Sequence, residues 1–217
     1  FSVQFFGALL LSTQFVPQFG LGKGIYFSIF HSISSFCNAG FDLFGHFNSV
    51  TGYWNNIVVL LTLSSLIIIG GIGFTVWFEL YNYRGIKKLS VHSKVVIVVS
   101  VALLIVGTIL MFLFEMNNKK TIGDMGFGYK VLNSYFASAS PRTAGMNSVS
   151  TDDMVNASKF LTVILMFIGG SPGSTAGGLK TSTFGVIILS VISVIRGRED
   201  AQVFGRRFSK ELVYKSL

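Results

Sequence analysis

Two short segments of the chain combine small and polar residues with an Ala-Gly pair. They are Cys37-Asn38-Ala39-Gly40 and Arg142-Thr143-Ala144-Gly145. Backbone carbonyls can replace the hydration shell of a cation without adding charge, and glycine tolerates the dihedral angles that turn successive carbonyls the same way. The segments therefore predict a cation filter. Its ligands would be the carbonyls near Asn38, Ala39, Thr143 and Ala144.

A plainer interpretation of each segment is a helix C-cap followed by an outer loop, since glycine is common in that role. The repetition favours the filter. An apolar stretch of about 16 Å as a helix, half of a membrane crossing, precedes each segment. These stretches are Tyr26–Phe36 and Tyr129–Ala139.

A second candidate site is a glycine-rich stretch inside the long apolar run Phe160–Ile195. It consists of Gly169, Gly170, Ser171, Pro172, Gly173, Ser174, Thr175, Ala176, Gly177 and Gly178. Its glycines and proline must break a helix. Without it, the run shortens from about 54 Å to about 39 Å, which suits one tilted crossing of a core of about 30 Å.

This break falls near the membrane centre, where unpaired backbone survives only beside water. The stretch therefore predicts an intramembrane gate, with the hydroxyls and Lys180 holding it closed. The alternative is a static kink packed against neighbouring helices. A milder copy, Gly70-Gly71-Ile72-Gly73, lies at the matching place in the first half of the chain and predicts plain close packing.

Charged residues beside the filter need separate explanations. Arg142 would repel cations if it faced the ion path, so we expect it behind the strand, paired with carbonyls or a carboxylate. The candidate carboxylates are Asp152, Asp153 and Glu115. Asp42 either concentrates cations at the mouth or is a solvated loop residue.

The composition indicates a membrane protein. Hydrophobic residues make up 51% of the 217 residues and charged residues only 12%, at a mean hydropathy of +0.64, whereas soluble domains approach a quarter charged residues. Candidate spans are Phe1–Val16, which looks truncated, Asn55–Phe78, Val95–Phe114 and the broken run Phe160–Ile195. Tyr53, Trp54 and Trp77 flank the second span as an aromatic belt would.

These elements repeat when Gly40 is aligned with Gly145. We expect an all-α integral membrane protein of tandem helix–pore loop–helix repeats around a central pore, as in potassium channels. Residues 1–84 form one repeat with a truncated first helix, residues 85–198 form the next with the intramembrane loop 169–178, and residues 199–217 form a cytoplasmic connection. Ten of the 17 lysines and arginines lie in the loop 79–94 and the tail from Arg196, which places both in the cytoplasm.

Other functional classes fit poorly. The basic residues lie between apolar runs, without the aromatic-interleaved surface of a nucleic-acid-binding protein. Gly173–Thr181 resembles a phosphate-binding loop, but Leu179 separates Gly178 from Lys180. The histidines His31, His46 and His92 lie in pore-loop or aqueous regions, which argues against an intramembrane protease and any other enzyme. His31 is expected to be a hydrogen-bonded structural residue.

Ser35-Phe36-Cys37-Asn38-Ala39-Gly40-Phe41 and Ser138–Gly145 resemble the second and third pore loops of the Trk/Ktr/HKT superfamily. The short loops are most similar to the membrane subunit of the Ktr system, and the resemblance covers nearly the whole chain. It implies four repeats, two of which are here. It implies potassium uptake across a bacterial cell membrane, with K⁺ as transported ligand, no cofactor, and Na⁺ as a further coupling or regulatory ion.

The resemblance also implies a homodimer and a cytoplasmic nucleotide-binding regulatory ring. Both visible glycine positions favour potassium over sodium. Four alternatives stay open. Two are a sodium-selective member of the superfamily and a Na⁺-coupled one. The others are a non-conducting membrane scaffold and an alternating-access transporter for a small anion, in which half-helix N-termini hold the anion.

Overall fold

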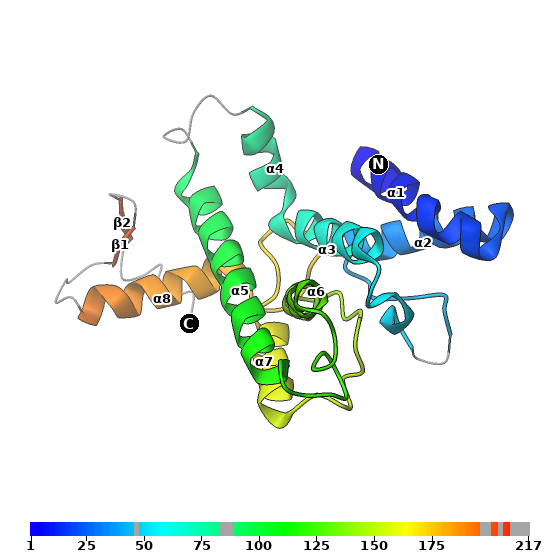
Figure 1. Ribbon diagram of the computed structural model, residues 1–217. Helices are drawn as coiled ribbons and strands as arrows, with labels where there is room; N and C mark the ends of the chain where they lie inside the picture. The colour runs from blue at the N-terminus through cyan, green and yellow to red at the C-terminus, as the bar shows by residue number, and fades with distance from the viewer. Residues whose placement is uncertain (46–47, 83–88, 196–200, 204–205, 209–217) are drawn as a thin grey trace.

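The computed structural model describes residues 1–45, 48–82, 89–195, 201–203 and 206–208 (Figure 1). The helices are α1 (Ser2–Phe19), α2 (Leu21–Phe36), the 3₁₀ turn η1 (Thr51–Tyr53), α3 (Ile57–Ile72), α4 (Phe74–Tyr81), α5 (Val91–Glu115), α6 (Phe127–Ala139), α7 (Asn156–Phe167) and α8 (Thr181–Ile195). Two short antiparallel strands, β1 (Ala201–Val203) and β2 (Arg206–Phe208), follow in the segment predicted as a cytoplasmic connection.

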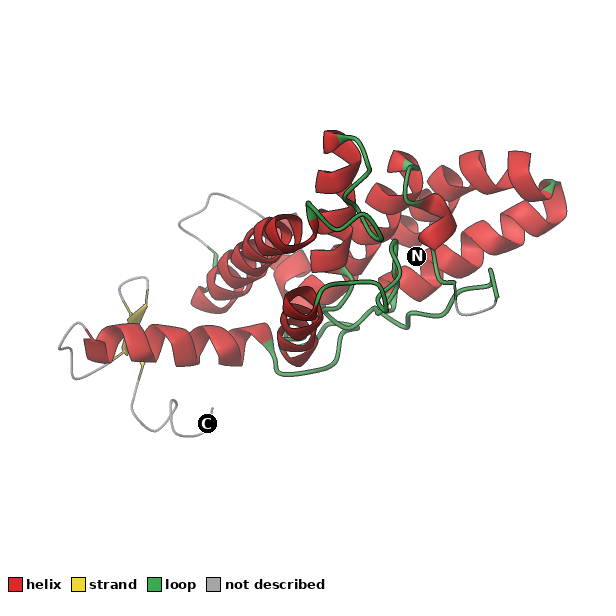
Figure 2. Ribbon diagram, turned by 60° about the horizontal axis from the view of Figure 1, so that its bottom comes forward, coloured by secondary structure: helices red, strands yellow, loops and turns green. Residues whose placement is uncertain are grey.

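The fold is that of an all-α membrane protein apart from this hairpin. Both halves of the chain begin with a helix that packs on a shorter one, α1 on α2 and α5 on α6. Because α3 also packs on α6, the second half-helix lies between the two halves. Figure 2 shows that the long loops thread among the helices in the middle of the molecule.

The first half-helix is longer than predicted. It begins at Leu21 rather than at Tyr26, directly after a one-residue turn at Gly20, whose φ is 79°. The sequence obscured this start because Lys23 looked like a loop residue. Its ammonium group lies over the rings of Phe19 and Phe27, 5.5 and 5.3 Å from their centroids, a favourable contact for a cation at an apolar surface.

Among the described residues, α5 is the helix that could cross a membrane by its own length and composition. Its outer face carries an exposed apolar stripe that includes Val98, Val101, Ile105 and Ile109, as expected of a helix against lipid. The pair α3 and α4 passes the same test when counted as one broken span.

Both long helices are broken at the glycine-rich positions. The predicted span Asn55–Phe78 is interrupted at Gly73, whose φ is 95°, and α3 and α4 differ in direction by 95°. The expectation of plain close packing there was therefore incomplete. In the second half, residues 168–180 separate α7 from α8, and the two helices do not line up as one tilted crossing (Figure 1). Instead α8 extends sideways and packs on α5.

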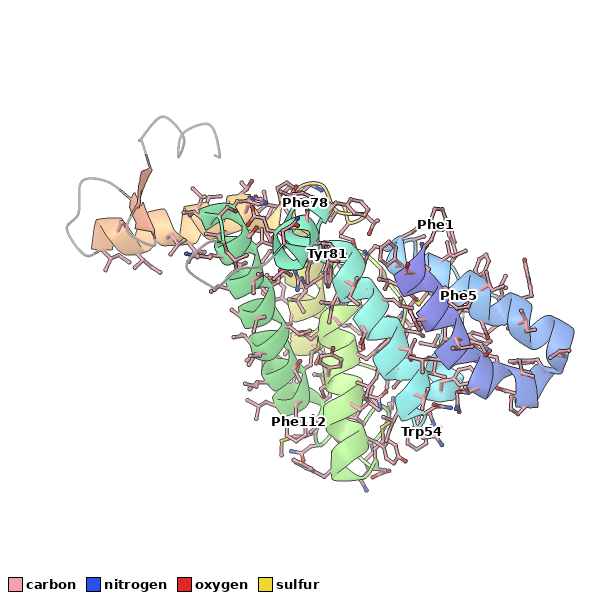
Figure 3. All side chains as sticks on the ribbon, turned by 90° about the horizontal axis from the view of Figure 1, so that it is seen from above. Phe1, Phe5, Trp54, Phe78, Tyr81 and Phe112 are labelled. Atoms are coloured by element: carbon pink, nitrogen blue, oxygen red, sulfur yellow. The ribbon has the colours of Figure 1, made fainter. Side chains whose placement is uncertain are left out.

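Aromatic and aliphatic side chains form the largest described core. Its buried members come from α1, α2, α3 and α6 and from the neighbouring loops. They are Leu11, Phe15, Phe27, Val50, Val59, Leu60, Leu63, Phe136 and Met146. Other aromatic side chains lie at two opposite edges: Phe78 and Tyr81 at one, Trp54 and Phe112 at the other (Figure 3). Such edges are typical of the two membrane interfaces.

Candidate cation site

The two Ala-Gly segments adopt the same unusual backbone conformation. We call residues 37–40 turn segment 1 and residues 142–145 turn segment 2. Positive φ angles occur at Asn38 (51°) and Gly40 (73°) in the first, and at Thr143 (93°) and Gly145 (80°) in the second. These are matching positions when the glycines are aligned. A positive φ in a residue other than glycine is uncommon and costs about 1 kcal/mol or more, so its repetition indicates a backbone that the fold holds in place.

The two turn segments touch. A Cβ atom built on Gly40 would overlap the carbonyl group of Ala144, whereas one on Gly145 would meet no described atom within 4 Å. The chains that leave the segments are also linked, since Val50 N donates to Asn147 O at 3.1 Å and Asn147 N donates to Ser49 Oγ at 2.9 Å. Both segments therefore lie side by side, as a shared ion path requires.

Main-chain oxygens in both segments are free to act as ligands. The carbonyls of Asn38, Ala39, Thr143 and Ala144 accept no hydrogen bond from the part of the chain that the structure describes. Asn38 and Ala144 are buried, Thr143 is half-buried and Ala39 is exposed. A buried carbonyl is nearly always paired, so the unpaired oxygens of Asn38 and Ala144 in particular suit a cation or water.

The carbonyl that follows each glycine is instead held by a hydroxyl. Ser34 Oγ donates to Phe41 O at 2.7 Å, and Ser140 Oγ donates to Met146 O. Neither serine hydroxyl was assigned this role from the sequence. The aligned repeat matches the acceptors Phe41 and Met146 but pairs Ser140 with Ser35 rather than with Ser34, so it could not have identified both donors.

The half-helices add a favourable field. α2 ends at Phe36, directly before turn segment 1, and α6 ends at Ala139, with two residues left before turn segment 2. A helix C-terminus carries a partial negative charge, so both ends favour a cation nearby.

The glycine-rich loop, residues 169–178, closes on itself at its neck. Gly169 N donates to Leu179 O at 3.0 Å, and Thr181 N donates to Gly170 O at 3.0 Å. Within the loop, Lys180 Nζ donates to Ala176 O at 2.8 Å and Ser174 Oγ donates to Ser171 O at 2.6 Å. The loop is a defined unit rather than an extended linker.

This loop docks on the break between α3 and α4. Ser171 N donates to Gly71 O at 2.9 Å, Thr175 N donates to Gly70 O at 3.2 Å, and Phe74 N donates to Gly173 O at 3.0 Å. Ser171 Oγ also donates to Ile72 O. The last carbonyls of a helix lack partners within it, and here the loop supplies them.

One side chain links the glycine-rich loop to turn segment 1. Thr175 Oγ1 donates to Phe36 O at 2.8 Å and accepts a hydrogen bond from Asn38 Nδ2 at 2.9 Å. A Cβ on Gly70 would overlap Phe36 O, so the glycine of α3 makes room for this junction. The two candidate sites are thus in direct contact.

Arg142 points behind turn segment 2, and of the two kinds of partner predicted it pairs with a carbonyl, together with a hydroxyl, rather than with a carboxylate. Its Nη1 donates to Ser100 O at 3.3 Å, and its Nη2 donates to Ser100 Oγ at 3.3 Å. The carboxylate of Glu115 is used elsewhere, accepting from Thr121 Oγ1 at 2.6 Å and from Val155 N at 2.9 Å. The guanidinium braces the segment on α5 through a carbonyl and a hydroxyl, so the carboxylates were wrong partners.

Several other predicted residues have mixed outcomes. The carboxylate of Asp42 accepts from Phe44 N at 2.9 Å, which stabilises a local turn. His31 is buried and hydrogen bonded, as expected. Several other residues of the predictions lie outside the described residues. They are His46, Arg84, Lys87, Lys88 and the basic residues at 196–200 and 209–217.

With the geometry in place, comparison with known proteins identifies the family. A family model described as a cation transport protein, TrkH, matches residues 5–217. The chain belongs to the TrkH family. The resemblance to the Trk/Ktr superfamily is thereby confirmed, and the family is one of cation transport proteins.

Relatives of this TrkH-family chain are named for ion uptake. The potassium/sodium uptake protein NtpJ of Enterococcus hirae is 43% identical over 215 residues, covering 99% of this chain and 47% of that protein. The Ktr system potassium uptake protein B of Bacillus subtilis is 38% identical over 216 residues, covering 100% and 48%. The chain thus spans about half the length of these relatives.

A solved structure shares the fold. The crystal structure of the potassium transporter TrkH from Vibrio parahaemolyticus matches with a TM-score of 0.74 at 19% identity. The match covers 99% of this chain and 45% of that one.

Proposed function

We propose that this chain supplies two of the repeats of a potassium uptake protein and that turn segments 1 and 2 contribute to its selectivity filter. K⁺ would be ligated by the carbonyls near Asn38, Ala39, Thr143 and Ala144. The observation that carries the proposal is the same pair of positive φ angles in two touching segments whose carbonyls are unpaired. Carbonyls so arranged can replace a hydration shell.

The filter is tested by replacing Gly145 with Ser. The site has room for a side chain, but at φ 80° a β-carbon strains the backbone, so the neighbouring carbonyls should shift. We expect a lower preference for rubidium, a potassium substitute, over sodium in uptake by cells that lack other potassium systems. The matched control is Gly128→Ser on α6, where a Cβ meets no described atom within 4 Å. Unchanged discrimination in G145S would contradict the filter assignment.

We further propose that the glycine-rich loop is an intramembrane gate in its closed position. The hydrogen bonds from Ser171 and Thr175 to the α3–α4 break, and from Lys180 within the loop, support this. Deleting residues 171–176 should raise the maximal uptake rate. A deletion variant that reaches the membrane folded but transports more slowly would favour the static kink.

A sodium-translocating or Na⁺-coupled activity is the second candidate, because the Enterococcus hirae relative is named a potassium/sodium uptake protein. Measuring sodium uptake beside rubidium uptake separates the two. An alternating-access mechanism is less favoured, because half-helices α2 and α6 ending at turn segments suit a fixed filter.

Assembly follows as part of the same proposal. The Ktr relatives are named as proteins of a system, which supports the presence of partner components. We propose that these are a second copy of the membrane subunit and a cytoplasmic nucleotide-binding ring. The loop 79–94 and the C-terminal tail would face that ring. Mass measurement of the protein purified in detergent, with and without its cytoplasmic partner, tests both interactions.

A further inference from the structure

The outer side of turn segment 1 carries a contact that turn segment 2 lacks. It is made by His31 of α2, which is fully buried. The imidazole ring stacks on Phe44 with their centroids 4.5 Å apart. Three further aromatic rings surround it: Phe15, Phe27 and Phe30.

The hydrogen bonds of His31 determine which ring nitrogen carries the proton. Nδ1 lies 2.7 Å from Phe27 O, and a carbonyl can only accept, so Nδ1 carries the hydrogen. Leu43 N donates to Nε2 at 3.3 Å, which requires a lone pair there. Both bonds are satisfied together only by the neutral ring protonated on Nδ1. Among aromatic rings, a charged imidazolium would be costly.

This arrangement joins the half-helix to the chain that leaves the turn segment. Leu43 lies three positions beyond Gly40, and one helical turn along α2 Ser34 holds Phe41 O. Residues three positions apart share a face of a helix. The chain after Gly40 is therefore held at Phe41 by Ser34 and at Leu43 by His31.

The second half of the molecule shows what happens without the histidine. Alignment of Gly40 with Gly145 places Phe136 opposite His31, and Phe136 is also fully buried. Ser140 still holds Met146 O, but a phenyl ring accepts no comparable bond. Phe136 also shows that an aromatic ring without nitrogen fits this place on a half-helix.

We propose that His31 is a positioning residue that determines how well turn segment 1 discriminates between cations. The proposal rests on the filter function proposed above. Gly40 lies so close to Ala144 O that no side chain fits between them, so a displacement of segment 1 changes its spacing from segment 2. Discrimination among cations depends on the number and placement of the coordinating carbonyls. A bond that anchors one end of segment 1 thus acts on selectivity.

Three substitutions at one position isolate the Leu43 bond. His31→Phe keeps the ring and loses both hydrogen bonds. His31→Asn can retain a bond to Phe27 O but is too short to accept from Leu43 N. His31→Gln places an oxygen near the position of Nε2 and restores the acceptor. In the natural full-length protein, we measure rubidium and sodium uptake for each, together with the KM and the maximal rate for rubidium.

We expect the ratio of rubidium to sodium uptake to fall roughly fivefold in H31F and H31N, the factor that corresponds to one net hydrogen bond. H31Q should keep the wild-type ratio. The matched control is Ser28→Ala on the same helix, which removes a bond from Ser28 Oγ to Gly24 O within α2 and should leave the ratio unchanged.

The outcomes separate this inference from the function on which it rests. Absence of rubidium uptake by the wild-type protein overturns the proposed function. Uptake with an unaltered ratio in H31F and H31N overturns the role of His31 alone. A ratio that is retained in H31F but lost in H31Q shows that ring packing, not the Leu43 bond, positions the segment. If H31F fails to reach the membrane, the comparison of H31N with H31Q still decides.

Discussion

A helix is interrupted at matching places in the two halves of the chain, between α3 and α4 and between α7 and α8. The two interruptions have different structures. The first needs one residue, Gly73, to turn the helix by 95°. The second uses residues 168–180 and closes its own neck by hydrogen bonds. A short break must stay rigid, because the helix resumes at once, whereas a longer one can be a separate unit.

The two breaks are also unequal partners. The break in α3 exposes carbonyls at Gly70, Gly71 and Ile72, and the loop supplies the donors for them. The glycine-rich loop thus docks on the carbonyls that the break in α3 exposes. This difference teaches that a glycine motif repeated in a sequence can break a helix at a single residue in one copy and form a separate hydrogen-bonded loop in the other.

The largest expected effect is a loss of stability at Gly70, where the glycine-rich loop docks on α3. Gly70→Ala would drive a methyl group into the Phe36 carbonyl and against Thr175 Oγ1, and we expect the free energy of unfolding to fall by about 3 kcal/mol, as overpacking of a filled site does. Gly71→Ala is the matched control, because a Cβ there meets no described atom within 4 Å. Thermal unfolding of the purified protein in detergent should show a loss in G70A only. Equal midpoints for the two variants would contradict the close packing of Gly70 against Phe36 O and Thr175 Oγ1.

An intermediate effect is expected where the loop meets turn segment 1. Thr175→Val keeps the shape but removes the hydrogen bonds of Thr175 Oγ1 to Phe36 O and from Asn38 Nδ2, which keeps only its longer bond to Ile67 O at 3.4 Å. Two lost hydrogen bonds of about 1 kcal/mol each should favour the displaced loop by more than tenfold, so the maximal rubidium uptake rate should rise.

Ser174→Ala provides the comparison for T175V, since Ser174 Oγ bonds within the loop to Ser171 O and Ala176 N. Its effect on the uptake rate should be smaller. If S174A accelerates uptake as much as T175V, the hydrogen bonds within the loop matter as much as those that join the loop to Phe36 and Asn38.

The smallest effect is expected at the brace of turn segment 2. Arg142 shares a small cavity with Gly71 of α3 and Gly170 of the loop, so it borders both breaks. Ser100→Ala removes the hydroxyl partner of Arg142 Nη2 but leaves the Ser100 carbonyl bond. We expect a loss of about 1 kcal/mol in the free energy of unfolding, seen as a midpoint lowered by a few degrees, with unchanged ion discrimination. Altered discrimination would show that the brace positions the filter carbonyls.

Two predictions from the sequence were incomplete for different reasons. Lys23 was set outside the half-helix, although Phe19, Lys23 and Phe27 follow one another at the four-residue spacing of a helix and the ammonium group lies over both rings. For Arg142 both carbonyls and carboxylates were expected, and the structure pairs it with the carbonyl and hydroxyl of Ser100 on α5. These two residues are 42 positions apart, and their contact leaves no periodic pattern in the sequence.

The sequence alone predicted two half-helices before Ala-Gly turn segments and the helix break at 169–178, because apolar run length and local glycine and proline content control these features. The break at Gly73 inside the predicted span Asn55–Phe78 and the start of α2 at Leu21 were found only in the structure. Tertiary structure alone decided that the two turn segments touch, that the loop rests on the α3 break, and that His31 accepts from Leu43. These contacts join residues that are far apart in the chain or on separate elements, and only the packing of whole helices brings their donors and acceptors within hydrogen-bonding distance.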